Sequence, residues 1–131
     1  DLYRETASRA GRDPKATPLS LNMHGFIAGT AAEAKDIFYP AHAEVMNRIG
    51  RERGWPPHGR SHFEASVGPR GHLLLGSPDD VADKIIGLHK IFRNDRILIQ
   101  MAIGAMPHRE VLRAIELLGT KVAPIVKENT R

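Results

Sequence analysis

Apolar and polar positions alternate along this chain with two periods, one typical of strands and one typical of helices. The clearest strand signal lies within residues 18–28, where two sets of side chains take turns: Leu19, Leu21 and Met23 on one face, and Ser20, Asn22 and His24 on the other. This alternation predicts a strand with one face packed on a core and one face open. Two further apolar segments, residues 73–75 and 96–103, predict two more strands.

Apolar residues at helical spacing fill the stretches between these strands and predict four helices. The helices cover residues 2–10, 31–53, 78–92 and 111–125. Regular alternation of helices and strands is typical of a parallel sheet with crossover helices, so we predict an α/β fold with three parallel strands. Because three parallel strands have two faces to cover, the pattern indicates one part of a larger α/β unit.

Short polar motifs mark where two of these helices begin. Thr30 with Glu33, and Ser77 with Asp80, have the spacing of capping boxes. Pro40 lies inside the long second helix, where we expect a kink or a broken first turn.

The segment at residues 55–71 is rich in proline and glycine, and we predict that it is one long loop. The rest of the pattern forms a single unit over residues 1–131, with no internal repeat. The first residue is Asp1, within what looks like a helix already in progress. We therefore expect a processed chain or a piece of a longer protein.

Composition narrows the class of protein further. Hydrophobic residues make up 41% and charged residues 26% of the 131, which is typical of a folded globular domain. The chain has no cysteine, which excludes disulfides, thiolate metal sites and a cysteine nucleophile. No apolar run is long enough for a membrane span or a signal peptide, so we expect a cytoplasmic protein without a membrane partner.

The sequence lacks the motifs of several common binding sites and active sites. The sequence contains no glycine-rich dinucleotide fingerprint, no P-loop and no serine elbow. His58, His62 and Glu64 are possible zinc ligands, but they lie in the predicted loop with Arg60 between them, so we expect no metal site. The net charge is a modest +4, and acidic residues interrupt the basic cluster before Trp55, so we expect no nucleic-acid partner.

The residues His24 and Gly25 are the strongest candidates for lining a ligand site. His24 belongs to the polar face of its strand, and a glycine next to it allows another group to approach the backbone. Both lie near the carboxyl end of the strand, where parallel α/β folds bind ligands. A purely structural histidine remains the alternative.

Three further residues, Ser77, Arg70 and His108, lie near strand ends, where a ligand could bind. Ser77 begins a helix, but Asp79 and Asp80 occupy the same turn and would repel a phosphate, so we expect a helix cap there and no anion site. Arg70 precedes the second strand and His108 follows the third, so either side chain could reach a ligand or be a plain surface residue.

Four segments, in this order, resemble the luciferase-like flavin-dependent monooxygenases. The segments are His24–Ala28, Gly50–Pro57, Gly71–Ile85 (GHLLLGSPDDVADKI), and a closing run with Gln100–Met101, Gly104–His108, Ile115–Gly119 and Val122–Pro124. The resemblance covers nearly the whole chain. Members of that family are TIM-like (β/α)8 barrels, so it implies that these residues are the C-terminal part of such a barrel.

The resemblance also implies a cofactor and a set of pocket residues. The complete protein would bind reduced FMN, possibly supplied by a separate reductase, and oxidise an organic substrate; the deazaflavin coenzyme F420 is the less favoured cofactor. This chain would form one wall of the pocket, with His24, Gly25 and Gly76 toward the flavin and Arg70, Met106 and His108 toward the substrate. The resemblance assigns no catalytic role to any residue here.

A second function class stays open at this stage. The chain could be a non-catalytic α/β binding module that self-associates through open sheet edges. Under either hypothesis we expect the isolated 131 residues to form homo-oligomers or to aggregate.

Overall fold

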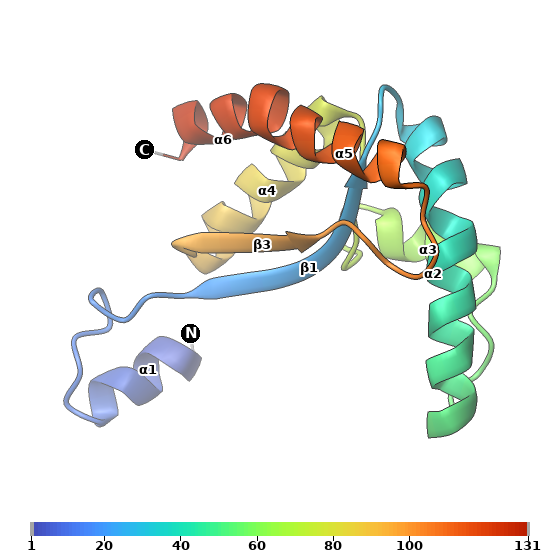
Figure 1. Cartoon of the computed structure of the whole chain (residues 1–131). Coiled ribbons are helices and arrows are strands. Elements are labelled where there is room, and N and C mark those ends of the chain that lie inside the picture. Colours follow the sequence, from blue (N-terminus) through green and yellow to red (C-terminus); the bar gives the residue numbers. More distant parts are fainter. Residues whose placement is uncertain (1, 131) are drawn as a thin grey trace.

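The computed structural model describes residues 2–130; Asp1, where the first helix was expected to be already in progress, and Arg131 lie outside the described residues. Its three strands are β1 (Ser20–Ile27), β2 (Leu74–Gly76) and β3 (Arg96–Gln100). The helical elements are α1 (Leu2–Arg9), α2 (Ala31–Arg53), α3 (Arg60–Val67), α4 (Pro78–Phe92), α5 (His108–Leu117), the π-helical turn η1 (Leu118–Val122) and α6 (Ala123–Asn129). Figure 1 shows their arrangement.

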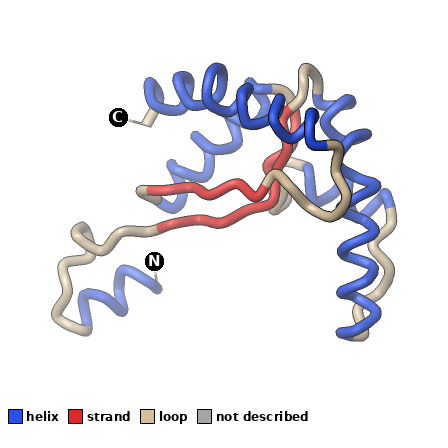
Figure 2. The backbone as a smooth tube through the Cα atoms, in the orientation of Figure 1, coloured by secondary structure: helices blue, strands red, loops and turns tan. Residues whose placement is uncertain are grey.

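All strand pairs are parallel, which confirms the predicted α/β class. The order across the sheet is β2-β1-β3. The first part of β1, Ser20–His24, pairs with β3, and the second part, Gly25–Ile27, pairs with β2. In a regular (β/α)8 barrel, strands that follow one another in sequence are neighbours, whereas here β3 pairs with β1. Figure 2 shows β1 curving upward between its two partners.

The core lies between the sheet and the helices α2, α4, α5 and α6. Met23 of β1 and Ile97 and Ile99 of β3 pack against it from the sheet, as the alternating pattern predicts. The fully buried side chains include Phe26, Phe38, Phe63, Leu73, Leu74, Val81 and Val122. Apolar burial of this kind is the main term that stabilises the arrangement.

Both predicted N-caps are present. The Thr30 side chain accepts a hydrogen bond from the backbone N–H of Glu33, and α2 ends at Gly54 in the left-handed conformation. The helix α2 is continuous across Pro40, so its first turn is not broken there. A kink at this residue stays a prediction. At α4, Ser77 and Asp80 form a complete capping box.

The prediction that residues 55–71 are one long loop is wrong, because α3 forms inside it. This helix has only eight residues and no side-chain cap, so its sequence carries no start signal. Its buried side chains, Phe63 and Ser66, face inward, and the Phe63 ring lies 4.9 Å from that of Tyr39 in α2. Packing against α2 therefore stabilises a helix that is too short to form alone.

The predicted last helix is interrupted once, by η1. Pro124 is the second residue of α6 and has no N–H to bond to the preceding turn. The π turn accommodates it, with the backbone N–H of Ala123 donating to Leu118. Such wide turns commonly absorb a local mismatch in a long helix.

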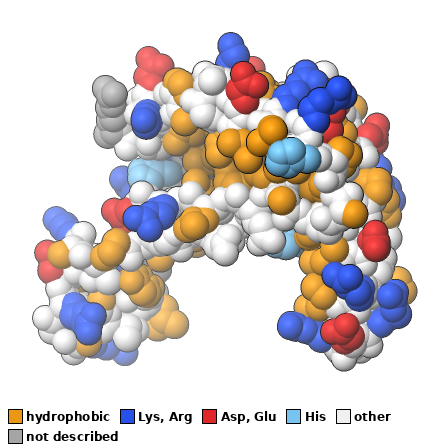
Figure 3. Space-filling view, in the orientation of Figure 1, with side chains coloured by type: hydrophobic (Ala, Val, Ile, Leu, Met, Phe, Trp, Pro, Cys, Tyr) orange, Lys and Arg blue, Asp and Glu red, His pale blue; other side chains and the backbone are white. Residues whose placement is uncertain are grey.

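The first helix, α1, lies apart from the other helices, at the amino end of β1 (Figure 1). Its Arg4 guanidinium donates to the carbonyl oxygens of Phe92 and Arg93, at 2.9 Å each, and so ties α1 to the end of α4. Below β1 the molecule is hollowed between α1 and the far end of α2 (Figure 3). Residues Ser20–His24 pair with β3 on one side. On their other side, no strand pairs with them within residues 2–130.

Candidate functional site

One face of the β1–β3 pair is open to solvent. Its side chains are those of Ser20, Asn22 and His24 on β1, and of Arg96, Leu98 and Gln100 on β3. All of them are exposed except His24, which is half-buried. The sequence pattern therefore assigns the open face of β1 correctly.

His24 and Gln100 form a polar pair at the carboxyl end of this face. They are direct register partners on adjacent parallel strands, so their side chains leave the sheet on the same side. An imidazole and a primary amide each offer both hydrogen-bond donors and acceptors. Sequence reasoning did not single out Gln100 as a site residue, although it lies in the closing run of the resemblance and is the polar last residue of β3, Arg96–Gln100.

A buried histidine, His42 of α2, lies behind His24. Its ring stacks on that of Phe38, with centroids 5.4 Å apart, and lies 5.6 Å from that of Phe63. The His24 ring meets it edge-on at 6.1 Å. His42 is 2% exposed, and neither of its ring nitrogens has a hydrogen-bond partner among the described residues.

Burial is the main cause that lowers the pKa of His42 to about 4, and the neighbouring imidazoles add to it. His42 is therefore neutral at physiological pH. Sequence reasoning did not single it out. The available signal was its position four residues after Phe38, next to Ala41 on the apolar stripe of α2.

The possible zinc ligands His58, His62 and Glu64 have different partners in the structure. The His58 and His62 rings lie 4.1 Å apart, whereas the Glu64 carboxylate accepts from Lys35 at 2.6 Å and from Arg60 at 2.8 Å. The contact with Lys35 is the main reason that the pKa of Glu64 is low. Within residues 2–130, no three His, Asp or Glu side chains are placed to hold a metal ion together.

The side chains of Ser77 and Asp80 occupy the amino end of α4. Both the backbone N–H and the hydroxyl of Ser77 donate to the Asp80 carboxylate, at 2.9 Å and 2.6 Å. These bonds lower the pKa of Asp80. With a carboxylate already bound there, the turn does not fit a phosphate group.

The two glycines expected near the flavin are both buried. A β carbon on Gly25 would meet the Leu74 carbonyl oxygen and, at 2.8 Å, a methyl group of Ile99. A β carbon on Gly76 would meet the Asp80 side chain at 2.7 Å. The groups that approach these glycines therefore belong to the protein itself, which favours a packing role; the flavin contacts stay predictions.

The residues expected on the substrate side come from separate elements. Arg70 is exposed in the turn between α3 and β2, and His108 is the exposed first residue of α5. Met106 is half-buried and lines a depression of about 310 Å³ with Ala41 and Glu44 of α2, among others. The structure places Met106 and His108 after β3 as predicted, and whether they meet a substrate stays a prediction.

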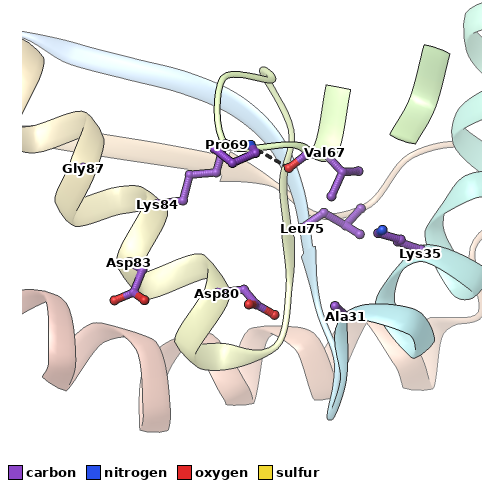
Figure 4. A pocket seen from close by; sticks show the side chains of 9 residues that line it. All are labelled: Ala31, Lys35, Val67, Pro69, Leu75, Asp80, Asp83, Lys84 and Gly87. Carbon is purple, nitrogen blue, oxygen red and sulfur yellow. Dashed lines mark hydrogen bonds between the residues drawn. The ribbon is translucent and has the colours of Figure 1, made fainter. Parts of the chain in front are cut away.

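A larger cavity of about 490 Å³ lies between the starts of α2 and α4 and the end of α3 (Figure 4). Lys84 reaches across it, and its ammonium group donates to the carbonyl oxygens of Val67, Gly68 and Leu73. Burial lowers the pKa of Lys84. Because all three protons of the ammonium group are used by these carbonyls, Lys84 is a structural tie between α4 and the turn before β2.

No protein-family model and no curated protein matches this chain. The solved structures that share its fold include two monooxygenases. One is the monooxygenase RslO1 from Streptomyces bottropensis, with a TM-score of 0.68 and 24% identity over 94% of this chain. The other is the oxygenating constituent of 3,6-diketocamphane monooxygenase, a type II Baeyer-Villiger monooxygenase from Pseudomonas putida in complex with FMN, with a TM-score of 0.62 and 24% identity over 93% of this chain.

This chain spans about a third of each of these proteins, 35% and 37% of their lengths. The likeness establishes that residues of this chain have the fold of the corresponding part of two monooxygenases. Within residues 2–130, no helix is long and apolar enough to cross a membrane.

Proposed function

We propose that this chain forms one wall of the flavin and substrate pocket of a luciferase-like flavin-dependent monooxygenase in the cytoplasm. It would be the C-terminal part of a (β/α)8 barrel whose strand order here, β2-β1-β3, departs from that of a regular barrel. The shared fold with two monooxygenases, one of them bound to FMN, is the observation that carries the proposal. The sequence resemblance over residues 24–124 supports it independently. Fold alone does not define an activity, so the site must be tested directly.

The open sheet face fits a flavin ring in one respect. His24 and Gln100 offer the donors and acceptors that the polar edge of an isoalloxazine ring requires. The start of α4 does not fit the phosphate of FMN, because Asp80 occupies it, so residues outside this chain must bind that group. FMN, when bound, would supply the electrons that reduce dioxygen.

The residues of this chain would bind and orient the flavin and the substrate and would shield them from water. His24 and Gln100 would hold the ring in one orientation, and we assign backbone contacts with the flavin to Gly25 and Gly76. Met106 would give an apolar contact to an organic substrate beside Arg70 and His108, and the packed wall behind them would exclude water. The substrate is a small organic molecule of unassigned structure, and we expect a homo-oligomer.

Flavin binding tests this proposal on two proteins, the 131-residue chain and the longest reading frame that contains it. FMN fluorescence is titrated with each, and the deazaflavin is titrated in parallel. Loss of one hydrogen bond costs about 1 kcal/mol, so His24→Ala or Gln100→Ala should each weaken FMN binding roughly fivefold. Ser20→Ala lies on the same face at the far end of β1 and is the matched control.

Binding of FMN by the longer protein, weakened by both variants and not by the control, would support the proposal. A longer protein that binds neither flavin would overturn it. Binding of the deazaflavin alone would replace FMN as the cofactor.

The unpaired edge of β1 favours a second candidate, a non-catalytic module that self-associates. Because both candidates predict self-association of the isolated chain, the flavin titration separates them, and gel filtration shows the form of the oligomer. A stable homodimer of the 131-residue chain, together with no flavin binding by either protein, would favour the module.

A further inference from the structure

Five of the seven histidines gather around the contact between α2 and the segment that follows it. His24 comes from β1 and His42 from α2, and His58, His62 and His72 all belong to the segment at residues 58–72. The His58 ring lies 6.2 Å from that of His42 and 4.1 Å from that of His62. The cluster shares His24 with the proposed flavin site, whereas its other four histidines have no role assigned in that site.

The cluster holds the segment to α2 with neutral rings. His42 packs between Phe38 of α2 and Phe63 of α3, and it makes no hydrogen bond through either ring nitrogen. A proton added to His42 would therefore create a buried cation without a partner, which is a costly state. The other four imidazoles would carry like charges around it.

The charged groups nearby give the cluster little compensation. On α3, Glu64 is bound by Lys35 and by Arg60, and Arg60 also lies over the Tyr39 and Phe63 rings. From α4, Lys84 adds a further positive charge near His72. Protonated imidazoles would thus meet mostly cations, and the shifts in the pKa of His42, His58 and His72 are all downward.

We propose that the histidine cluster is an acid-sensitive latch, which holds residues 58–72 against α2 and β1 at neutral pH and releases them when the rings gain protons. The segment contributes Phe63 to the core, and the rest of the core also has contacts of its own. The sheet pair β1–β3 and the helices α4 and α6 pack through other residues, among them Ile85 and Val122. Release would expose Phe38 and Phe63, two of the largest buried side chains.

The segment must also break a small set of polar contacts to leave. The Asn47 side chain accepts from the backbone N–H of His58 at 2.7 Å, and the Lys84 ammonium holds the carbonyls of Val67 and Gly68. These contacts are partly buried, and the Lys35–Glu64 ion pair and the bond from the Leu73 N–H to the Ser66 carbonyl oxygen must break as well.

The single tryptophan, Trp55, precedes the segment and packs near Gly50 of α2, so its fluorescence reports the release. The whole 131-residue chain is titrated from pH 7.5 to pH 3.5, and amide hydrogen exchange is measured in parallel. We expect a fluorescence transition with its midpoint between pH 6.5 and pH 4. Amides of α3 should then exchange freely while those of β1, β3 and α4 stay protected.

The variant His42→Phe removes the buried imidazole and keeps an aromatic ring among aromatic neighbours. It should move the midpoint down by at least one pH unit. His108→Gln removes a histidine outside the cluster and should leave the midpoint unchanged. The surface variant His62→Gln, which keeps the core intact, should lower the midpoint by a smaller amount.

Two results would overturn the latch. One is an unchanged midpoint in both His42→Phe and His62→Gln. The other is simultaneous loss of protection in α3 and in β1, because global acid unfolding would then explain the fluorescence change. If His42→Phe does not fold, the His62→Gln titration decides alone.

Discussion

The carbonyl oxygen of Leu74 occupies the space where a β carbon on Gly25 would stand. Gly25 is also the residue at which β1 changes partner, from β3 to β2. Gly25→Ala would push the β2 backbone and the Ile99 side chain away, and overpacking of this kind costs roughly 1–3 kcal/mol or more. Urea unfolding should show this loss as a lower midpoint with an unchanged slope.

Gly87→Ala is the matched control for that substitution. A β carbon at Gly87, inside α4, meets no atom within 4 Å. The helix should gain about 0.5–1 kcal/mol from the lost flexibility of the unfolded chain. If Gly25→Ala proved as stable as the native chain, the packing of β1 against β2 described above would be incorrect.

Ser77→Ala should destabilise the protein by about 1 kcal/mol. The variant removes the hydroxyl that accepts from the backbone N–H of Asp80 and donates to its carboxylate. Thermal unfolding at pH 7 measures the loss. Ser61→Ala, an exposed serine in α3, should change the melting temperature much less, and equal effects would argue against the capping box.

Acid should lower the free energy of unfolding through His42. The unfolded imidazole gains a proton near pH 6.5, whereas the folded one resists until about pH 4, so the unfolded state binds more protons within this window. Stability is therefore complete above pH 6.5 and falls as the pH drops toward 4, by about 3 kcal/mol from this one group. Urea unfolding at a series of pH values measures the slope, which should become shallower in His42→Phe. An equal slope in both proteins would exclude His42 as the cause.

Lys84→Met should loosen the turn before β2. The substitution keeps the length of the side chain and leaves the carbonyls of Val67, Gly68 and Leu73 without their donor. Each buried carbonyl left unpaired costs on the order of 1–3 kcal/mol, less where water enters. Amide exchange should rise at residues 68–73 first. Lys90→Met, at an exposed position of the same helix, serves as the control.

Leu98→Lys should weaken self-association of the isolated chain. Leu98 is 49% exposed on the open sheet face, where a second copy would bury it. Ile91→Lys removes a more exposed apolar side chain, at 73%, from the end of α4 and away from that face. Sedimentation at several concentrations should show fewer oligomers for Leu98→Lys alone. A chain that is monomeric before any substitution would contradict the expected oligomer.

Local sequence signals predicted the elements that have strong periodicity and caps. The alternation around Met23 gave β1 and its open face, and the caps at Thr30 and Ser77 gave the starts of α2 and α4. They failed at α3, whose eight residues carry no cap and fold only against Tyr39 and its neighbours. The substrate-side and cofactor residues stay predictions.

The sequence by itself determined the α/β class, the parallel strands and the side of β1 that faces solvent, because each of these depends on residues close together in the chain. Only the tertiary structure decided that Gln100 lies beside His24, and that the His42 ring lies near those of His24 and His58. These arrangements depend on strand register and on the packing of α3 against α2. Both are set by contacts between residues far apart in the chain, which local periodicity does not encode.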